Sequence, residues 1–266
     1  MAESISSVKE QFKVGGPLVT EEDMKAEMRR LEGVCEAYQG DERKAVQSEI
    51  AKAKKRITDK YEAELLRTEK MLSYEREYAS YAYICGIDEA GRGPLAGPVC
   101  AGAVILPRDT KLLFLNDSKK LSASAREELF DIIKEQAVSF GIGLASPQRI
   151  DEINILQATY EAMRDAVSQL DPQPEVLLND AVTIPKLSMK QVPIVHGDAR
   201  SASIAAASIL AKVTRDRIMV QYDELFPQYG FAGHKGYGSA EHIAALKKYG
   251  PTPIHRRSFI GHFVEV

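Results

Sequence analysis

The first part of the chain, residues 20–75, has the pattern of amphipathic helices. Charged residues dominate it, and Gly and Pro are nearly absent. The first apolar positions are Met24, Met28, Leu31 and Val34. Their i, i+4, i+7, i+10 spacing places them on one face of a helix. A break near Gly40 and Asp41 divides the segment, so we predict two helices in a hairpin.

A basic run lies on the second of these helices. Its members are Lys52, Lys54, Lys55, Arg56 and Lys60. Such a run is most often the solvated face of a surface helix, and we favour this interpretation. The alternative is an arm that contacts nucleic acid.

From residue 83 onward, short β-branched stretches alternate with helical periodicity. Strands are predicted at 83–89, 99–106, 138–145, 176–178 and 192–195, and helices at 124–136, 150–170, 201–225 and 239–249. This alternation predicts a layered α/β domain whose sheet is parallel in part. We therefore divide the chain into a charged helical extension, 1–75, and a second domain, 76–266.

Composition and charge narrow the class of protein. The chain has 266 residues, of which 44% are hydrophobic and 27% charged, which excludes collagen, disulfide scaffolds and wholly disordered chains. The net charge of −3 gives no support to nucleic-acid binding, although a basic groove can lie on an acidic body. Three cysteines without metal-ligand spacing indicate free thiols. With no signal peptide and no membrane-spanning segment in the sequence, we expect a cytoplasmic protein.

The segment around Asp88 and Glu89 carries the most chemical information. These acids end a predicted apolar strand and are followed by the turn Gly91-Arg92-Gly93. Glycines let backbone N–H groups approach a ligand closely, and Arg92 could bind phosphate. Adjacent residues of a regular strand point to opposite faces, so both acids can serve one ion only if the strand ends or bulges there.

Two further predicted strands also end in acids, Asp180 and Asp198. Ligand sites of open α/β sheets lie beyond the carboxyl ends of parallel strands, so we expect these acids to converge with Asp88 and Glu89. Oxygen ligands without Cys or His select hard cations, Mg²⁺ or Mn²⁺. The five histidines are scattered along the chain, and none is predicted as a ligand. The pattern indicates phosphoryl-transfer chemistry.

Several motifs together resemble bacterial ribonuclease HII, in the order that is typical of this family. They are GIDEAGRGPLAGP at 86–98, DSKKLS at 117–122, HGDARSASIAAAS at 196–208, AKVTRD at 211–216, HKGYG at 234–238 and TPIHRRSF at 252–259. The resemblance implies a ribonuclease H-like mixed sheet flanked by helices, here with an N-terminal helical hairpin extension. It also implies an endonuclease that cleaves the RNA strand of RNA/DNA hybrids.

The resemblance implies more about substrate and cofactor. Incision is expected 5′ of single ribonucleotides embedded in duplex DNA, leaving 3′-hydroxyl and 5′-phosphate ends, in ribonucleotide removal and RNA primer removal. The cofactor is expected to be Mn²⁺ or Mg²⁺, with two ions when substrate is bound. We expect a monomer that does not bind membranes, and a sliding clamp is a partner for which the sequence gives no support.

Carried over by position, the resemblance assigns residues to roles. The metal-binding, catalytic acids are Asp88, Glu89, Asp180 and Asp198. The Gly91-Arg92-Gly93 turn would bind the ribose 2′-hydroxyl through its backbone, the group that distinguishes RNA from DNA. Tyr237 would stack on the sugar of the next, deoxy, nucleotide. Ser118 and Lys119 offer hydroxyl and ammonium donors to phosphate oxygens.

Basic residues elsewhere leave questions open. Lys212, Arg215 and Arg217 could face a duplex, with Asp216 pairing with one of them. The sequence leaves open whether the cluster formed by His255, Arg256 and Arg257 contacts DNA.

Three alternatives remain at this point. A dinucleotide-binding oxidoreductase would explain the glycine-rich turn, but two acids beside it would repel a pyrophosphate. A binding module without catalysis gains nothing from several acids facing a polyanion. The sister family, ribonuclease HIII, shares the fold, but its acidic pair and its N-terminal domain differ.

Overall fold

The computed structural model describes residues 3–13, 21–110 and 112–265. These residues divide into two compact units. One contains the chain up to residue 70 together with 112–115, and the other contains 71–110 and 116–265. Our boundary at 75/76 stays a prediction.

The first unit is a small helical assembly made of α1 (Ile5–Gln11), α2 (Glu21–Ala37) and most of α3 (Lys44–Met71). The predicted hairpin is confirmed, with its break between Ala37 and Lys44. Met24 and Leu31 are buried in its core, whereas Met28 and Val34 are partly buried at its edge. Helix α1 was not predicted, because its seven residues offer too few apolar positions to show a period.

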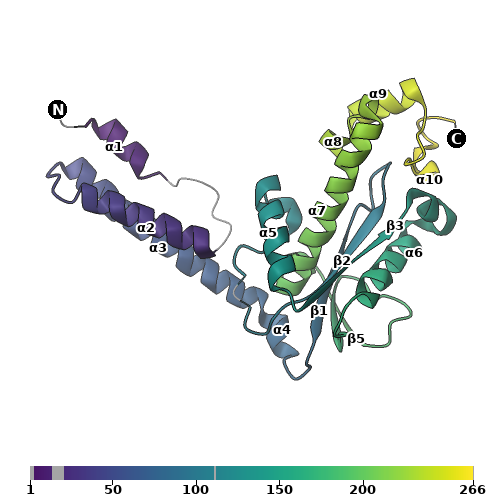
Figure 1. Ribbon diagram of the computed structural model, residues 1–266, viewed down its shortest axis with the longest axis horizontal. Coiled ribbons are helices and arrows are strands. Elements are labelled where there is room, and N and C mark those ends of the chain that lie inside the picture. The colour runs from purple at the N-terminus through teal and green to yellow at the C-terminus, as the bar shows by residue number, and fades with distance from the viewer. Residues whose placement is uncertain (1–2, 14–20, 111, 266) are drawn as a thin grey trace. The chain divides into compact units, whose positions relative to one another are not determined.

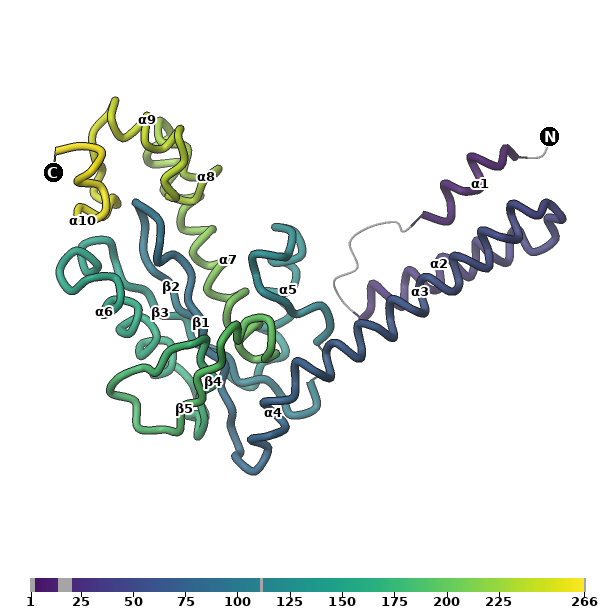
Figure 2. The backbone as a smooth tube through the Cα atoms, turned by 180° about the vertical axis from the view of Figure 1, so that it is seen from behind, coloured from purple at the N-terminus to yellow at the C-terminus, as the bar shows by residue number. Residues whose placement is uncertain are grey.

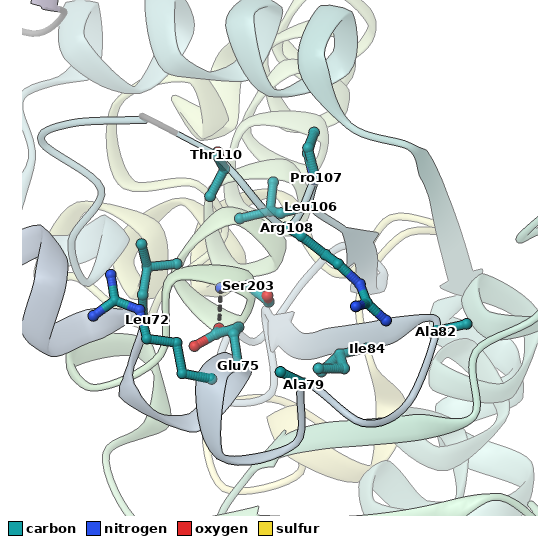
Figure 3. Close-up of a pocket in the computed structure, with 11 residues that line it drawn as sticks. Leu72, Glu75, Ala79, Ala82, Ile84, Leu106, Pro107, Arg108, Thr110 and Ser203 are labelled. Atoms are coloured by element: carbon teal, nitrogen blue, oxygen red, sulfur yellow. Dashed lines mark hydrogen bonds between the residues drawn. The ribbon is translucent and has the colours of Figure 1, made fainter.

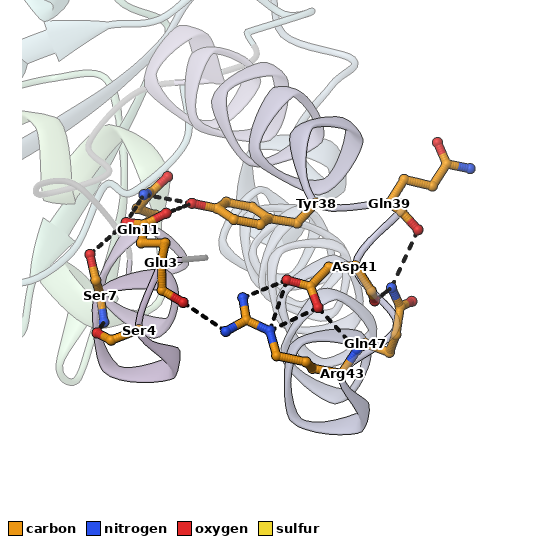
Figure 4. Close-up of polar contacts among 9 residues, drawn as sticks. All are labelled: Glu3, Ser4, Ser7, Gln11, Tyr38, Gln39, Asp41, Arg43 and Gln47. Atoms are coloured by element: carbon orange, nitrogen blue, oxygen red, sulfur yellow. Dashed lines mark hydrogen bonds and ion pairs between the residues drawn. The ribbon is translucent and has the colours of Figure 1, made fainter. Parts of the chain in front are cut away.

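Polar contacts tie the start of the chain to the loop between α2 and α3 (Figure 4). The Tyr38 hydroxyl bonds the Glu3 carboxylate, and Gln11 Nε2 donates to the Tyr38 oxygen at 2.8 Å. Arg43 donates to the Glu3 carbonyl at 2.7 Å and pairs with Asp41. Glu3 and Gln11 are exposed, and Tyr38, Asp41 and Arg43 are partly buried, so these contacts fix local geometry more than they add stability.

The second unit is built on a mixed five-stranded sheet (Figure 1). Its strands are β1 (Ile84–Ala90), β2 (Val99–Ile105), β3 (Ser139–Ala145), β4 (Val176–Asp180) and β5 (Lys190–Ile194). The order is β3-β2-β1-β4-β5; β1, β2 and β3 pair antiparallel, while β4 is parallel to both β1 and β5. The predicted strands and partly parallel pairing are confirmed.

Helices cover both faces of this sheet. The helices of this unit are α4 (Ser73–Glu77), α5 (Ala123–Gln136), α6 (Pro147–Ser168), α7 (Ala202–Leu225), α8 (Phe231–His234), α9 (Ala240–Tyr249) and α10 (Arg257–Ile260), and the long helices α6 and α7 cover the sheet. Helix α7 packs on β1 and β2 and carries α5 beside it, whereas α6 covers β2 and β3 from the other face. Both views show this division (Figure 1, Figure 2).

Close packing between α7 and the sheet depends on small residues on both sides. A Cβ atom on Gly86 of β1 would lie 2.0 Å from the Ser203 carbonyl carbon, and one on Gly102 of β2 would lie 2.4 Å from the Ala207 oxygen. Neither distance is sterically allowed. The Ala-rich sequence of α7 and these strand glycines therefore bring the helix against the strand that carries Asp88.

Candidate active site

The four predicted acids lie at the carboxyl ends of neighbouring strands. Asp88 and Glu89 lie in the last three residues of β1, just before the glycine turn, and Asp180 is the final residue of β4. Asp198 lies in the short 3-10 helix Gly197–Ala199 that follows β5. Because β1, β4 and β5 are parallel, their ends meet at one edge of the sheet, as the sequence predicted.

The backbone shows whether the strand ends or bulges at Asp88 and Glu89. The pairing with β2 runs without a bulge, with Asp88 opposite Gly102 and Glu89 opposite Ala101. The strand therefore does not bulge on this side, but it ends at Ala90, directly after Glu89. On the other side the pairing with β4 stops at Ile87, so the two acids lie where β1 has lost its parallel neighbour.

The electrostatics show that these carboxylates are neighbours. Burial raises the pKa of Asp88 well above its ordinary value, and the charges of Glu89 and Asp180 raise it further. Burial also raises the pKa of Glu89, against the opposing charge of Arg92, whose Nη1 lies 3.3 Å from the Glu89 Oε1. Asp88 and Glu89 are thus made harder to ionise by burial and by the charge of Asp180.

A fifth acid, Asp117, joins this group. Burial raises the pKa of Asp198, and Asp117 and Asp180 add to that effect. The sequence analysis had named only the donors that follow Asp117 in its motif. An acid directly before Ser118 and Lys119 was the available signal, and we had not assigned it a role.

Lys119 lies close to the same group of acids. Partial burial acts against its charged form, yet its pKa is raised, because four carboxylates attract the ammonium group. They are Asp117, Asp198, Asp88 and Asp180. The predicted phosphate-binding lysine therefore lies within reach of the acids.

Ser118 has a different environment from Lys119. It is buried, and its hydroxyl lies 2.9 Å from that of Ser208 on α7, which in turn hydrogen-bonds the side chain of Asp88. Ser208 was not predicted as a site residue. Its hydroxyl also supports the first acid of the group.

The glycine turn and Tyr237 lie together next to the acids. Gly91 has φ +94°, and a Cβ there would be 2.0 Å from Arg215 Nε, so only glycine fits. A Cβ on Gly93 would lie 3.9 Å from the Tyr237 ring, which is half exposed. The turn, Tyr237 and the acid-bearing strand end thus face a common space.

That space is a cavity of about 470 Å³. Its lining includes every predicted substrate-binding residue and one predicted catalytic acid: Gly91, Arg92, Gly93, Ser118, Lys119, Tyr237 and Glu89. It also includes three cations from α5 and α7: Arg126, which the sequence analysis did not name, and Lys212 and Arg215, which it named as residues that could face a duplex. The motif at 211–216 was the signal for two of them.

The cations of α7 fall into different environments. Lys212 pairs with Asp216 at 2.8 Å, which confirms the predicted ion pair. Arg217 pairs with Glu127. Arg215 is buried and donates to the carbonyls of Pro98, Ala96 and Lys235 at 2.9 to 3.1 Å, so it does not face a duplex.

Three of the five histidines, which are scattered along the sequence, lie together behind Tyr237 in the fold. His255 Nδ1 accepts from the Thr252 N–H at 3.0 Å, so its Nε2 carries the proton that is donated to His242 Nε2, also at 3.0 Å. His242 Nδ1 then donates to the Tyr237 carbonyl at 2.9 Å. His234 stacks on His242 with ring centroids 4.5 Å apart.

This arrangement requires neutral rings. Burial lowers the pKa of His255 to about 4 and lowers that of His242 as well. Protonating His242 would place two donors face to face across the 3.0 Å contact between the rings, and protonating His255 would place its Nδ1–H against the Thr252 N–H. The chain from Thr252 to Tyr237 therefore holds the Tyr237 loop while its imidazoles are uncharged.

A second, smaller cavity of about 90 Å³ lies near the start of β1 and the N-terminus of α7 (Figure 3). Glu75 projects into it and caps α7, accepting from the Ser201 hydroxyl at 2.6 Å and the Ser203 N–H at 2.9 Å. The strand-end acids do not line this cavity. Glu75 therefore has a structural role in the described unit.

The acids fit a divalent cation by chemistry and by charge. Their ligand atoms are oxygens, which hard cations prefer, and a cation would relieve the repulsion that raises their pKa values. In the described side-chain arrangement, no three His, Cys, Asp or Glu residues are yet placed to hold one ion. Nor, within those residues, is any helix long and apolar enough to cross a membrane.

Comparison with known proteins decides the family. The model of Ribonuclease HII matches residues 85–262, and that of the Ribonuclease HII N-terminal domain matches residues 4–79. The chain belongs to the ribonuclease HII family. The predicted resemblance is thereby confirmed, and it extends to the helical segment that our motifs did not cover.

Sequence relatives span nearly the whole chain. Ribonuclease HII of Lachnoclostridium phytofermentans is 62% identical over 228 residues, which cover 86% of this chain and 89% of the relative. Ribonuclease HII of Clostridioides difficile is 53% identical over 235 residues, with 88% and 92% covered. The chain is therefore a metal-dependent ribonuclease H that acts on RNA/DNA substrates, and the oxidoreductase and binding-module alternatives are wrong.

Solved structures confirm the fold. The Pyrococcus horikoshii ribonuclease H2 aligns with a TM-score of 0.55 at 29% identity, covering 66% of this chain and 93% of that one. The Archaeoglobus fulgidus ribonuclease HII, solved in complex with PCNA, gives 0.55 at 28% identity, covering 66% and 94%. The Bst ribonuclease HIII, in complex with Mn²⁺, aligns at 0.52 with 16% identity, covering 66% and 67%, and shows the shared fold alone.

Proposed function

We propose that this ribonuclease HII incises 5′ of single ribonucleotides in duplex DNA as well as cleaving the RNA strand of RNA/DNA hybrids. The observation that carries the proposal is a single cavity that joins the acid-bearing end of β1 to the Gly91–Gly93 turn and Tyr237. One wall presents acidic and basic side chains, such as Glu89 and Lys119, to a phosphodiester. The other presents backbone and an aromatic ring to a sugar.

The acids are the proposed cation ligands. Asp88, Glu89, Asp180 and Asp198 would hold Mn²⁺ or Mg²⁺, with two ions when substrate is bound. Such ions stabilise the charge that develops on the attacked phosphate and lower the pKa of a coordinated water. The repulsion among the carboxylates, seen in the raised pKa values of Asp88 and Asp198, supports this assignment.

The turn and Tyr237 are the proposed determinants of the cleavage position. Backbone N–H groups of Gly91-Arg92-Gly93 would donate to the ribose 2′-oxygen, which deoxyribose lacks. Tyr237 would stack on the next sugar, where a planar ring favours deoxyribose. Its nearness to Gly93 supports recognition of two successive nucleotides.

The proposed reaction is the hydrolysis of one phosphodiester bond. A water oxygen forms a new bond to the phosphorus on the 5′ side of the ribonucleotide, and the bond from phosphorus to the 3′-oxygen of the preceding nucleotide breaks. That oxygen takes a proton, leaving a 3′-hydroxyl and a 5′-phosphate. Lys119 and Ser118 would bind phosphate oxygens, Lys119 as a cation beside the acids and Ser118 from its buried position.

We place this activity in ribonucleotide removal from DNA and in RNA primer removal, by a monomer in the cytoplasm. The PCNA complex of the Archaeoglobus fulgidus relative makes a sliding clamp a partner to be tested, and we do not assign residues to it.

The test is incision of a labelled DNA duplex that contains one ribonucleotide. We expect a single cut 5′ of that nucleotide, only with Mn²⁺ or Mg²⁺, and a product that a 5′-phosphate-dependent exonuclease degrades. An all-deoxy duplex of the same sequence is the control. Cleavage of long hybrids without incision at the single ribonucleotide would contradict the proposal and leave ribonuclease H activity intact.

A further inference from the structure

The side chain of Arg256 is fully buried and faces the back of the glycine turn. All three nitrogens of its guanidinium group donate to backbone carbonyls. Nη2 donates to Gly91 at 2.6 Å, Nη1 to Arg92 at 2.8 Å and Nε to Gly97 at 3.0 Å. Burying a cation is costly unless its donors are satisfied, and here backbone carbonyls satisfy them. Of the basic cluster at 255–257, whose contact with DNA the sequence left open, His255 and Arg256 are buried and Arg257 is exposed.

The two shortest of these bonds fix the orientation of consecutive peptide planes. In a trans peptide the C=O and the following N–H point in opposite directions. Because the Gly91 carbonyl points to Arg256, the Arg92 N–H points away from it, and the Arg92 carbonyl likewise directs the Gly93 N–H away. Both donors thus face away from the buried guanidinium, and the turn that carries them lines the large cavity.

We propose that Arg256 is a positioning residue that sets the discrimination between ribose and deoxyribose, by aiming the Arg92 and Gly93 N–H groups at the 2′-oxygen of the bound nucleotide. The inference rests on the proposed function, in which this turn binds the 2′-hydroxyl. Arg256 itself contacts no substrate. It acts through the two peptide planes that it holds.

Arginine suits this role better than other side chains. Its planar fork can donate to two carbonyls of successive residues and to a third at once, whereas a lysine ammonium is a point charge on a flexible stem. The main chain adds rigidity, because the Arg256 N–H donates to the Leu95 carbonyl at 2.9 Å and the Gly97 N–H to that of Ile254 at 2.8 Å. The turn is therefore held along its length by the segment that contains Arg256.

The test compares the affinity of the protein for two duplexes in a metal chelator, where no cleavage occurs. One duplex contains a single ribonucleotide and the other is all-deoxy with the same sequence. We expect the wild type to prefer the first by about tenfold, the value of a hydrogen bond to the 2′-oxygen. Arg256→Lys should lower this ratio to about one and leave the affinity for the all-deoxy duplex within twofold.

Two further variants separate positioning from general stability. Met163→Ala removes a buried side chain of α6 on the far face of the sheet, so it should lower the unfolding midpoint and keep the wild-type ratio. Arg256→Gln supplies a neutral donor in case the lysine variant does not fold, and should also lose the ratio. Circular dichroism establishes that each variant is folded.

The outcomes are distinct. A wild-type ratio in folded Arg256→Lys or Arg256→Gln overturns the inference, and so does loss of the ratio in Met163→Ala. If the wild type itself does not distinguish the two duplexes, the proposed role of the turn fails, and the inference fails with it. A ratio that is present in the wild type and lost only at Arg256 supports both.

Discussion

Two groups of buried charges lie in the same unit, and their surroundings differ in kind. Asp88 and Asp198 at the strand ends are 7% and 8% exposed, and Arg215 and Arg256 behind the turn are 1% and 0% exposed. Both acids lie close to Asp180, and their pKa values are raised by burial and by like charges. The arginines donate to three backbone carbonyls each.

This difference separates a binding function from a structural one. A buried arginine whose three nitrogens each donate to a backbone carbonyl holds those carbonyls in place. A group of like charges gains free energy when an ion of opposite sign arrives. Lys119 and Arg92 offset the acids only in part, since the pKa values of Asp88 and Glu89 stay raised. This difference supports the proposed cation binding at the strand ends and a rigid, structural role for the arginines.

The largest effect is expected for Asp88→Asn. Loss of one ligand charge should reduce the single-turnover incision rate by about a thousandfold or more, since a bound cation supplies several kcal/mol of transition-state stabilisation. The free energy of unfolding should stay the same or rise, because one of several repelling charges is gone. Denaturant unfolding checks the second part.

Asp165→Asn is the matched control for this substitution. Asp165 is an exposed carboxylate on α6, so the same change there should alter neither the rate nor the stability. If Asp88→Asn unfolded the protein, Asp88 would belong with the structural charges, and the distinction between the strand-end acids and the buried arginines would be wrong.

Gly91→Ala should combine a loss of stability with a loss of activity. The new Cβ would lie 2.0 Å from Arg215 Nε at a residue with φ +94°. We expect a free energy of unfolding lower by about 2–4 kcal/mol and an incision rate lower by about tenfold or more, because the turn must shift. Gly233→Ala, where nothing lies within 4 Å of the added Cβ, should change the incision rate little.

A pH-dependent effect of intermediate size is expected from the histidines behind Tyr237. The folded pKa of His255 is about 4, below its ordinary value of 6.5, so the unfolded chain binds more protons between these values. Stability should be complete above about pH 6.5 and fall by about 1–3 kcal/mol as the pH drops toward 4. His234 and Arg257 add positive charge nearby and act in the same direction.

Denaturant unfolding between pH 4 and pH 7 measures this slope. The variant His255→Asn has no titrating ring at that position, so its slope should be shallower than that of the wild type. Equal slopes in the two proteins would show that the buried imidazole chain does not titrate as described.

The smallest effect is expected for Ser208→Ala. The hydroxyl bonds Ser118 at 2.9 Å and supports Asp88, so its loss should lower the stability by about 1 kcal/mol and the incision rate a few-fold. The exposed Ser168, on α6, offers the same substitution as a control without contact to the site. A thousandfold loss in Ser208→Ala would place this hydroxyl among the reacting groups.

The sequence predicted those features that local pattern determines. Periodicity placed the helical hairpin and the strands β1 to β5 to within a few residues, and Ser122 caps α5 as its position before the helix suggests. It did not predict α1, which is stabilised by burial of Val8 and Phe12 against the other helices and not by a long period of its own.

Within the site, the sequence predicted residues that sit at strand ends and in motifs. It could not predict the supporting contacts, because they join residues far apart along the chain. Arg256 bonds Gly91 across 165 positions, and His242 meets His255 across 13. Such pairs leave no periodicity, so the histidines looked scattered, and Arg256 looked like a member of a local basic cluster, until the fold placed them behind the turn.

The most direct test of cation binding by the strand-end acids is a calorimetric titration of Mn²⁺ into the protein without substrate. We expect saturable binding of Mn²⁺ by the wild type. The affinity for Mn²⁺ should fall at least about tenfold in both Asp88→Asn and Asp180→Asn and stay unchanged in Asp165→Asn. Equal Mn²⁺ affinity in all four proteins would contradict this expectation, since the repelling carboxylates would then not be the cation's ligands.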